Sequence, residues 1–155
     1  IKRIDIKSAE DMYEEIMNIS DAQDIIIKAA AVADYTPANY CDEKIKKKDG
    51  DLTIELSRTK DILKELGERK ENNPKKQFIC GFSMETENME ENSKSKLVKK
   101  NVDMIVANNV KIEGAGFGTD TNVVTIFTKD DEIRLDKLSK LEVAEKIFDE
   151  IVRNF

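Results

Sequence analysis

The sequence predicts an α/β fold of three layers, with helices on both faces of a mainly parallel sheet and with a hairpin arm. Strand-like and helix-like segments alternate through most of the 155 residues, an order that favours a parallel sheet. The segment 24–31 is apolar at consecutive positions, as expected of a strand covered on both faces. Since no repeat or low-complexity linker interrupts the chain, we expect one domain over residues 1–155.

The first elements are identified by capping and periodicity. Residues 4–6 alternate like a short strand, and Ser8 and Asp11 have the spacing of a capping box before an amphipathic helix. The strand at 24–31 follows this helix. Because the chain begins at Ile1 inside a strand-like run, we expect it to be a piece of a longer protein.

The hairpin arm is predicted between the second strand and the next helix. Residues 52–56 alternate between apolar and polar side chains, and Asp49-Gly50 is a turn signal that would pair them with residues 44–48. Thr59 is expected to cap a helix over residues 60–70. The arm therefore comes directly before a helix that returns to the sheet.

The second half of the chain continues the alternation. Strands are predicted at residues 77–82 and 102–107, with a helix at 88–100 between them. Residues 123–128 alternate again and are expected to pair with 132–135 across an Asp-Asp turn. This order is typical of a Rossmann-like three-layer αβα fold with a mainly parallel sheet and a hairpin arm.

The last helix is expected to begin at a second capping box, formed by Ser139 and Glu142. One stripe of its surface carries apolar side chains at helical spacing, and we expect this stripe to face the core. The residues of the stripe are Leu141, Ala144, Ile147, Phe148 and Ile151.

Composition excludes several kinds of function. The net charge of −6 argues against a general partner among nucleic acids or anionic membranes. The chain has no histidine, which excludes Ser-His-Asp and Cys-His catalysis and every histidine-dependent metal site. Cys41 and Cys80 cannot form a structural zinc site by themselves, and no signal peptide or long apolar segment is present. We therefore expect a cytoplasmic protein with reduced thiols.

Three strand ends are candidate ligand positions, because ligands of parallel sheets bind beyond the carboxyl ends of the strands. They are residues 30–34, 81–85 and 108–109. At the first of them, small side chains would let a planar ligand approach the backbone. Asp34 and the lysines of residues 44–48 could then serve the ribose and phosphates of a nucleotide.

Each of these features also has a structural explanation. Lys96 and Lys100 lie four residues apart on one helix face, yet cations are favourable near any helix C-terminus. The lysines at 44–48 are equally typical of a charged edge strand. The glycine-rich residues 114–118 precede a strand and lack the spacing of a dinucleotide fingerprint, so we expect a turn there.

Motifs along nearly the whole chain resemble one family in order and in kind. They are Ala30-Ala31-Val32-Ala33-Asp34-Tyr35-x-Pro37, Glu43-Lys44-Ile45-Lys46-Lys47, Thr59-x-Asp61-Ile62, Gly81-Phe82-x-x-Glu85-Thr86, Lys96-x-x-x-Lys100-Asn101-x-Asp103, Ala107-Asn108 and Gly116-Phe117-x-x-Asp120-x-Asn122. Each is weak alone, but the combination resembles phosphopantothenoylcysteine synthetase, also called phosphopantothenate–cysteine ligase.

The resemblance implies a CTP-dependent ligase of coenzyme A biosynthesis that joins 4′-phosphopantothenate to L-cysteine through an acyl-cytidylate, with Mg²⁺ as cofactor. It implies that Lys44 is catalytic, beside the activated intermediate, and that Asn108 lies on the acyl-substrate side. No residue is expected to ligate a metal by itself. The implied nucleotide-binding residues are Lys28, Ala29, Ala30, Ala33, Asp34, Tyr35, Lys60, Asp61, Ile62, Leu63, Phe82, Lys96 and Lys100.

The resemblance also implies a homodimer with the hairpin near its interface, and many bacterial relatives are fused to a flavin-dependent phosphopantothenoylcysteine decarboxylase. Two departures stand out. The family's N-terminal glycine-rich strand and Asn/Ser-rich loop do not precede Ile1, and Lys60 stands where bacterial members often have proline. A non-catalytic nucleotide-binding or dimerisation module is therefore the alternative, whereas an oxidoreductase is disfavoured because no G-x-G-x-x-G is present.

Overall fold

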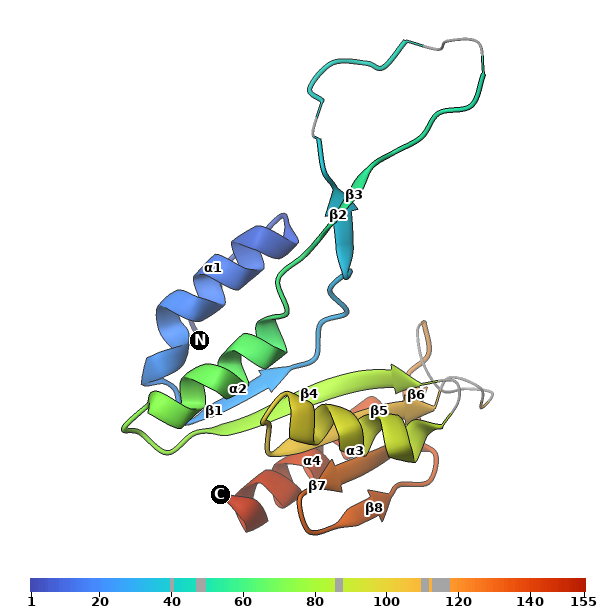
Figure 1. Cartoon of the computed structure of the whole chain (residues 1–155). Coiled ribbons are helices and arrows are strands. Elements are labelled where there is room, and N and C mark those ends of the chain that lie inside the picture. The colour runs from blue at the N-terminus through green and yellow to red at the C-terminus, as the bar shows by residue number, and fades with distance from the viewer. Residues whose placement is uncertain (40, 47–49, 86–87, 110–111, 113–117) are drawn as a thin grey trace.

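A five-stranded sheet in the order β1-β4-β5-β7-β8 forms the centre of the fold (Figure 1). The computed structural model describes residues 1–39, 41–46, 50–85, 88–109, 112 and 118–155. The strands of the sheet are β1 (Ile25–Lys28), β4 (Phe78–Glu85), β5 (Met104–Asn109), β7 (Val124–Thr128) and β8 (Glu132–Arg134). Strands β1, β4 and β5 pair in parallel, β7 is antiparallel to both its neighbours, and four of the five strands thus share one direction. The predicted mainly parallel sheet is confirmed.

Helices cover both faces of this sheet (Figure 1). One face carries α1, α2 and α3, and the other carries α4. The capping boxes predicted before the first and last helices are both present, and the helix predicted at 88–100 is confirmed as α3. The bounds are α1 (Ala9–Ile19), the short 3-10 helix η1 (Ser20–Ala22), α2 (Ile62–Asn72), α3 (Met89–Lys99) and α4 (Lys140–Asn154).

The core follows from strands that are apolar on both faces. In β4, Ile79 joins the cluster under α2 and α3, while its neighbours Phe78 and Cys80 join the cluster under α4. Strand β7 divides in the same way, with Phe127 on the first face and Ile126 on the second. Each strand side chain points to the opposite face from the next, so consecutive apolar residues build two hydrophobic layers.

The arm leaves the body as two chain segments that pair only near its base (Figure 1). Strand β2 (Tyr35–Pro37) pairs antiparallel with β3 (Leu56–Arg58). The predicted pairing of residues 44–48 with 52–56 is wrong, since 44–46 and 52–55 form no strand, while residues 47–49 lie outside the described part of the chain. The physical reason is exposure: an isolated two-stranded hairpin is marginal in water, and the apolar side chains of Ile45, Leu52 and Ile54 on the arm are exposed rather than packed.

The first residues and the start of α2 also differ from expectation. Residues 4–6 form no strand, and none of the described strands pairs with them. Thr59 is not the cap of α2, because its Oγ1 donates to the Ala33 carbonyl at 2.6 Å. Asp61 caps the helix instead, accepting a hydrogen bond from the backbone N–H of Lys64 at 3.1 Å. A long-range contact thus replaces the local one that the sequence suggested.

The predicted stripe of α4 is partly wrong. Ile147 and Ile151 are buried as expected, and Val143 is buried with them. Leu141 is 70% exposed and Phe148 is 53% exposed, so the helix is rotated away from the predicted face. The apolar band of this helix is wider than the contact it makes with the sheet, and the sequence alone did not show which edge would be covered. A two-stranded ladder of β6 (Thr121–Asn122) and β9 (Leu138–Ser139) leads into the helix.

Asp103 joins the C-terminal part of α2 to the start of the parallel sheet. Its Oδ1 lies 2.5 Å from Lys70 Nζ, and its Oδ2 accepts from the Ile79 backbone N–H at 2.8 Å. The Asp103 N–H donates in turn to the Ile79 carbonyl at 3.0 Å. One carboxylate therefore satisfies a half-buried cation and a backbone donor at the point where β4 and β5 begin to pair.

Asp103→Ala is expected to lower the free energy of unfolding by about 2 kcal/mol, because it leaves the Lys70 cation and the Ile79 N–H without their shared partner. Urea denaturation followed by circular dichroism measures the change. Asp5→Ala is the control, since the Arg3–Asp5 pair is exposed on the surface and such pairs contribute roughly 0–1 kcal/mol. Equal losses in the two variants would contradict the anchoring role of Asp103.

Candidate functional site

A cavity of about 310 Å³ lies where the carboxyl ends of β1 and β4 meet. The parallel register pairs Lys28, the last residue of β1, with Gly81. Strand β4 continues to Glu85, so residues 30–34, which follow β1, and residues 82–84 of β4 both line the cavity. Gly81 also makes room for α2, because a Cβ on this glycine would lie 2.5 Å from Leu63 Cδ2. The lining residues are Lys28, residues 30–34, residues 59–63, residues 82–84, Lys96 and Lys100.

The cavity brings together most residues that the sequence singled out. Every predicted nucleotide-binding residue except Ala29 and Tyr35 lines it. Tyr35 begins β2 instead, with the Arg58 guanidinium 5.9 Å from its ring centre. Lys44 lies on the arm and Asn108 lies in β5, and neither lines this cavity. Asn108 accepts a hydrogen bond from Asn122 Nδ2 at 3.2 Å.

Five lining residues were not predicted as site residues. Four of them lie within the strand ends 30–34 and 81–85 that the sequence marked as candidate ligand positions, and the fifth directly precedes Lys60, so the available signal was position at a strand end or helix start. The five are Ala31, Val32, Thr59, Ser83 and Met84. The side chain of Thr59 ties the start of α2 to residues 30–34, and this contact closes one wall of the cavity.

Two lysines of the cavity are paired with carboxylates. Lys100 Nζ lies 3.1 Å from Asp61 Oδ2, and Lys96 Nζ lies 2.5 Å from Glu85 Oε1. Burial alone would raise the pKa of Asp61, but the Lys64 N–H and the charges of Lys100 and Lys28 lower it overall. Asp61 is therefore ionised at neutral pH. Both lysine side chains stay partly exposed, so a polyanion entering the cavity can compete for them.

The surroundings of Lys28 disfavour its charged form. Burial lowers the pKa of Lys28, and the positive charge of Lys100 lowers it further, although Asp61 and Asp34 oppose the shift. Lysines held near one another in this way are stabilised when an anion binds between them. The electrostatics of the cavity therefore favour a negatively charged ligand.

Lys60 lines the cavity but is held by α1. Its Nζ lies 2.5 Å from Glu10 Oε1 and 4.1 Å from the centre of the Tyr13 ring. The hydrogen bond to Glu10 raises the pKa of Lys60. The ammonium is thus charged and already partnered, so it contributes less to anion binding than its position suggests.

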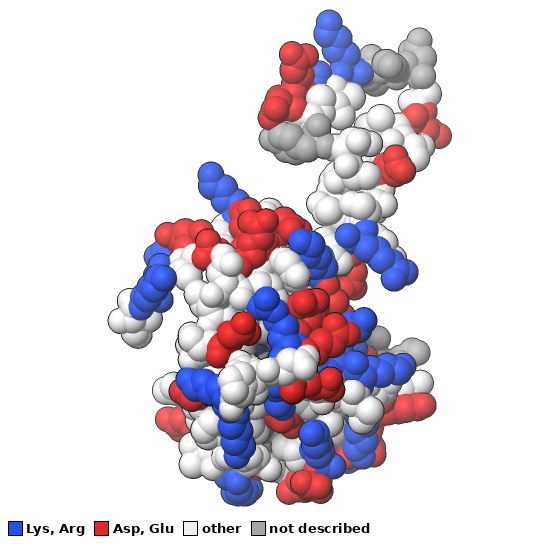
Figure 2. Space-filling view, turned by 60° about the vertical axis from the view of Figure 1, so that its left-hand side comes forward, with Lys and Arg blue, Asp and Glu red and all other residues white. Residues whose placement is uncertain are grey.

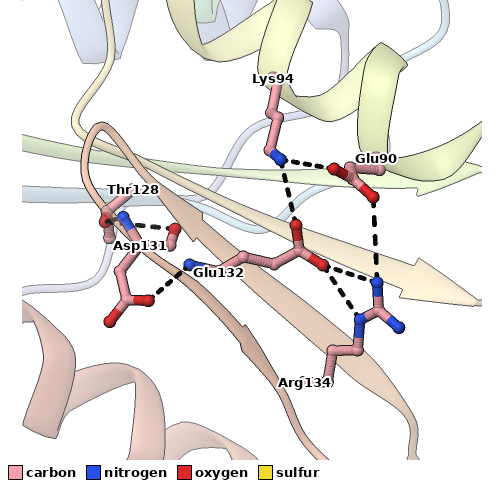
Figure 3. Close-up of polar contacts among 6 residues, drawn as sticks. All are labelled: Glu90, Lys94, Thr128, Asp131, Glu132 and Arg134. Carbon is pink, nitrogen blue, oxygen red and sulfur yellow. Dashed lines mark hydrogen bonds and ion pairs between the residues drawn. The ribbon is translucent and has the colours of Figure 1, made fainter.

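Helix α3, which carries Lys96 and is followed directly by Lys100, is tied to the β7–β8 hairpin by charged side chains (Figure 3). Lys94 lies 2.6 Å from Glu90 and 3.1 Å from Glu132, and Arg134 lies 2.9 Å from Glu132. Hydrogen bonds to Glu90 and Glu132 raise the pKa of Lys94. Each exposed pair contributes little to stability, but together they fix the helix over the sheet.

Other chemistries find less support in the described part of the chain. No group of three or more histidine, cysteine, aspartate or glutamate side chains there could hold a metal ion. Burial raises the pKa of the Cys80 thiol to about 12, so it is not a thiolate nucleophile at neutral pH. Acidic and basic side chains are interspersed over the body of the molecule in Figure 2, and no described helix is long and apolar enough to cross a membrane.

Comparison with known proteins shows which family this chain matches. Residues 1–155 match the family described as the DNA/pantothenate metabolism flavoprotein C-terminal domain. The chain is 54% identical over 149 residues to the Coenzyme A biosynthesis bifunctional protein CoaBC of Bacillus subtilis, a match that covers 96% of this chain and 36% of the relative. The chain thus spans little more than a third of the length of that curated relative.

Solved structures share the fold. The crystal structure of the C-terminal domain of CoaBC is 43% identical, with a TM-score of 0.75, and the match covers 97% of this chain and 66% of that chain. A Cab2 mutant in complex with phosphopantothenate-cysteine is 18% identical, with a TM-score of 0.69, and the match covers 93% of this chain and 51% of that chain. The second likeness concerns the fold alone.

Lys100→Gln is expected to raise the pKa of Lys28, because the variant removes the repulsion from the Lys100 charge while burial remains. Heteronuclear NMR of the Lys28 side chain through a pH titration measures the change. Lys99→Gln removes one charge from the same end of α3 without touching the cavity and is the control. A Lys28 pKa that stays constant in Lys100→Gln would contradict the electrostatic coupling described above.

Proposed function

We propose that this chain, which belongs to the DNA/pantothenate metabolism flavoprotein C-terminal domain family, is the nucleotide-binding part of a CTP-dependent phosphopantothenate–cysteine ligase of coenzyme A biosynthesis. The observation that carries the proposal is the cavity beyond β1 and β4, where Lys28, Lys96 and Lys100 converge on one space. Relatives named for coenzyme A biosynthesis support it, since the CoaBC protein of Bacillus subtilis is 54% identical.

The proposed reaction has two steps. A carboxylate oxygen of 4′-phosphopantothenate bonds to the α-phosphorus of CTP, and the bond to pyrophosphate breaks. The cysteine amine then attacks the acyl carbon of the acyl-cytidylate, loses a proton and releases CMP. The first step brings several anionic groups together, so lysines that neutralise them stabilise its transition state. Holding carboxylate and phosphorus in line supplies further acceleration.

In this proposal, one group of cavity residues binds the phosphates of the nucleotide and another binds its nucleoside. Lys96 and Lys100 hold the phosphates after exchanging their carboxylate partners for phosphate oxygens. Lys28 lies between the two groups at the end of β1, and Asp34 meets the cytidine moiety. The small side chains of residues 30–33 let the nucleoside approach the backbone, and the backbone of residues 33–35 helps to select the base.

Mg²⁺ fits this site as a companion of the nucleotide. The described residues offer no metal cage of their own, and Mg²⁺ in nucleotide sites is bound largely by substrate phosphates and water. When bound, the ion neutralises phosphate charge and assists departure of pyrophosphate. The contribution of the chain is then to hold the phosphates with Lys96 and Lys100.

The arm is proposed to carry Lys44 to the activated intermediate and to contribute to a homodimer. Lys44 lies outside the lining of the cavity beyond β1 and β4. Leu52 and Ile54 of the same arm are 70% and 63% exposed, and apolar side chains on a projecting segment favour burial against another surface. A second copy of the chain would bury them.

The acyl-substrate half is proposed to need a further segment of the protein. Strand β1 is an edge of the described sheet, and its Ile25 and Ile27 are 38% and 37% exposed. An added strand along this edge would cover both side chains. The proposed segment corresponds to the glycine-rich strand and Asn/Ser-rich loop of the family, and fusion to a flavin-dependent decarboxylase would extend the protein further.

A non-catalytic nucleotide-binding or dimerisation module is the second candidate, and the open edge of β1 is the observation that favours it. A ligase assay of the chain alone, and of the chain with the N-terminal segment of a relative restored, separates the two functions. Product formation only after restoration supports the ligase. Failure of the restored protein supports the module.

Nucleotide selectivity tests the proposal directly. With Mg²⁺ present, isothermal titration calorimetry of the chain is expected to show CTP binding at least about tenfold tighter than ATP, GTP or UTP, a difference of about 1.4 kcal/mol. The physical reason is that the phosphate contacts are common to all four, so the base contacts of residues 33–35 must discriminate. Equal binding of all four nucleotides would contradict selectivity for CTP, and absence of binding would exclude CTP as a ligand of this chain.

Lys44 has its own test in the full-length ligase. Lys44→Gln is expected to reduce product formation by at least about a hundredfold, because it removes a charge beside the developing phosphate and carboxylate charges. Lys44→Arg keeps the cation and should retain more activity, and Lys99→Gln, outside the site, should remain near wild type. Quantifying pyrophosphate and product separates the two steps. Unchanged turnover in Lys44→Gln would remove this residue from the mechanism.

A further inference from the structure

The C-terminal end of α3 is closed by an asparagine in a left-handed conformation. Asn101 has a φ of 49°. Its N–H donates to the Val98 carbonyl at 3.1 Å, and the next N–H, of Val102, donates to the Leu97 carbonyl at 3.2 Å. This is the hydrogen-bond pattern of a Schellman motif, in which glycine is the usual residue at the left-handed position. The presence of asparagine calls for a reason beyond the backbone.

The Asn101 side chain supplies that reason, because it holds α2. Its Nδ2 donates to the Gly67 carbonyl at 3.0 Å and to Glu71 Oε1 at 3.1 Å. At the same point the two backbones touch, since a Cβ on Gly67 would lie 1.8 Å from the Lys100 carbonyl oxygen. The end of α3 is thus fixed to the middle of α2 by a close approach that only glycine permits and by a side-chain amide.

Lys100 lies between this anchor and the cavity. Its carbonyl oxygen faces Gly67, while its ammonium lies 3.1 Å from Asp61, the N-cap of the same helix. Residues 100 and 101 therefore contact α2 at its start, its middle and its last turn. Helix α2 therefore sets the main-chain position of Lys100. This position determines how far the Lys100 ammonium extends into the cavity.

We propose that Asn101 and Gly67 are positioning residues that set the place of Lys100 on α2 and thereby its reach to an anionic ligand in the cavity. The part that concerns nucleotide phosphates rests on the function proposed above. Placement matters because charge-assisted hydrogen bonds are short and directional, and small displacements of a positioning group weaken them. Neither residue touches the ligand in this proposal, since both act through Lys100.

Asn101→Gly tests the proposal, because glycine keeps the left-handed backbone and removes only the amide. Asn88→Gly is a matched control at the other end of α3, where Asn88 also has a φ of 49° but makes no side-chain cap hydrogen bond. The first readout needs no ligand. Since Lys100 lowers the pKa of Asp61, Asn101→Gly is expected to raise that pKa in a carboxyl ¹³C NMR titration, and Asn88→Gly is not.

The second readout is CTP affinity with Mg²⁺, measured by calorimetry. Asn101→Gly is expected to weaken CTP binding about fivefold, which is within the contribution of one charge-assisted hydrogen bond. Its effect on the binding of cytidine, which has no phosphate and is followed by NMR shifts, should stay within about twofold. In a Lys100→Gln background the same substitution should change CTP affinity by less than about twofold, since it acts through a side chain that is already absent.

The outcomes are separable. An Asp61 pKa that is unaffected by Asn101→Gly, or raised equally by Asn88→Gly, overturns the positioning role whatever the wild-type chain binds. A wild-type chain that binds no CTP overturns the proposed function, and the Asp61 titration then decides the positioning role alone. Equal losses of CTP affinity in the wild-type and Lys100→Gln backgrounds show that Asn101 does not act through Lys100, and they overturn the inference.

Discussion

The parallel pairing of β1 with β4 is the constraint on which the candidate site depends. Its register sets the end of β1, at Lys28, beside Gly81, so the chain that follows β1 lines the cavity together with residues 82–84 of β4. The second parallel pair, β4 with β5, extends this edge and sets Glu85 beside Asn109. A slip of one residue would turn each strand's side chains to the opposite face. The two hydrophobic layers that oppose such a slip therefore also preserve the geometry of the cavity.

Charge inside the cavity is balanced in pairs before any ligand enters. Asp61 faces Lys100, and Glu85 faces Lys96, so each of these partly buried charges has an opposite charge beside it. Lys28 is less well balanced, because burial and the charge of Lys100 lower its pKa. An arriving polyanion would gain from this imbalance and would replace two carboxylates that remain close by. In the proposed function, the lysines of these pairs would exchange their carboxylate partners for phosphate oxygens.

Local patterns in the sequence predicted the features that local interactions determine. Both capping boxes, at Ser8 and Ser139, are present because each involves residues only three positions apart. The cap of α2 was not predictable in this way, since the hydroxyl of Thr59 is taken by Ala33, 26 positions earlier. The buried face of α4 likewise depends on packing, because Leu141 and Phe148 were as apolar as the residues that the sheet covers.

In the candidate site, too, the sequence predicted what local patterns determine and not what long-range contacts determine. Strand ends could be identified from the sequence, and the rule that parallel strands present them at one edge placed Asp34, Phe82 and their neighbours together. Residues 100 and 101 show what that rule leaves out. Their motif was visible in the sequence, but its anchor is Gly67, more than thirty positions away, inside a helix where glycine is a weak helix former. Glycine destabilises the interior of a helix. At position 67 it is needed because any Cβ there would collide with the Lys100 carbonyl oxygen. A glycine in mid-helix and an asparagine at a helix end are thus two halves of one contact, and only the tertiary fold shows that they belong together.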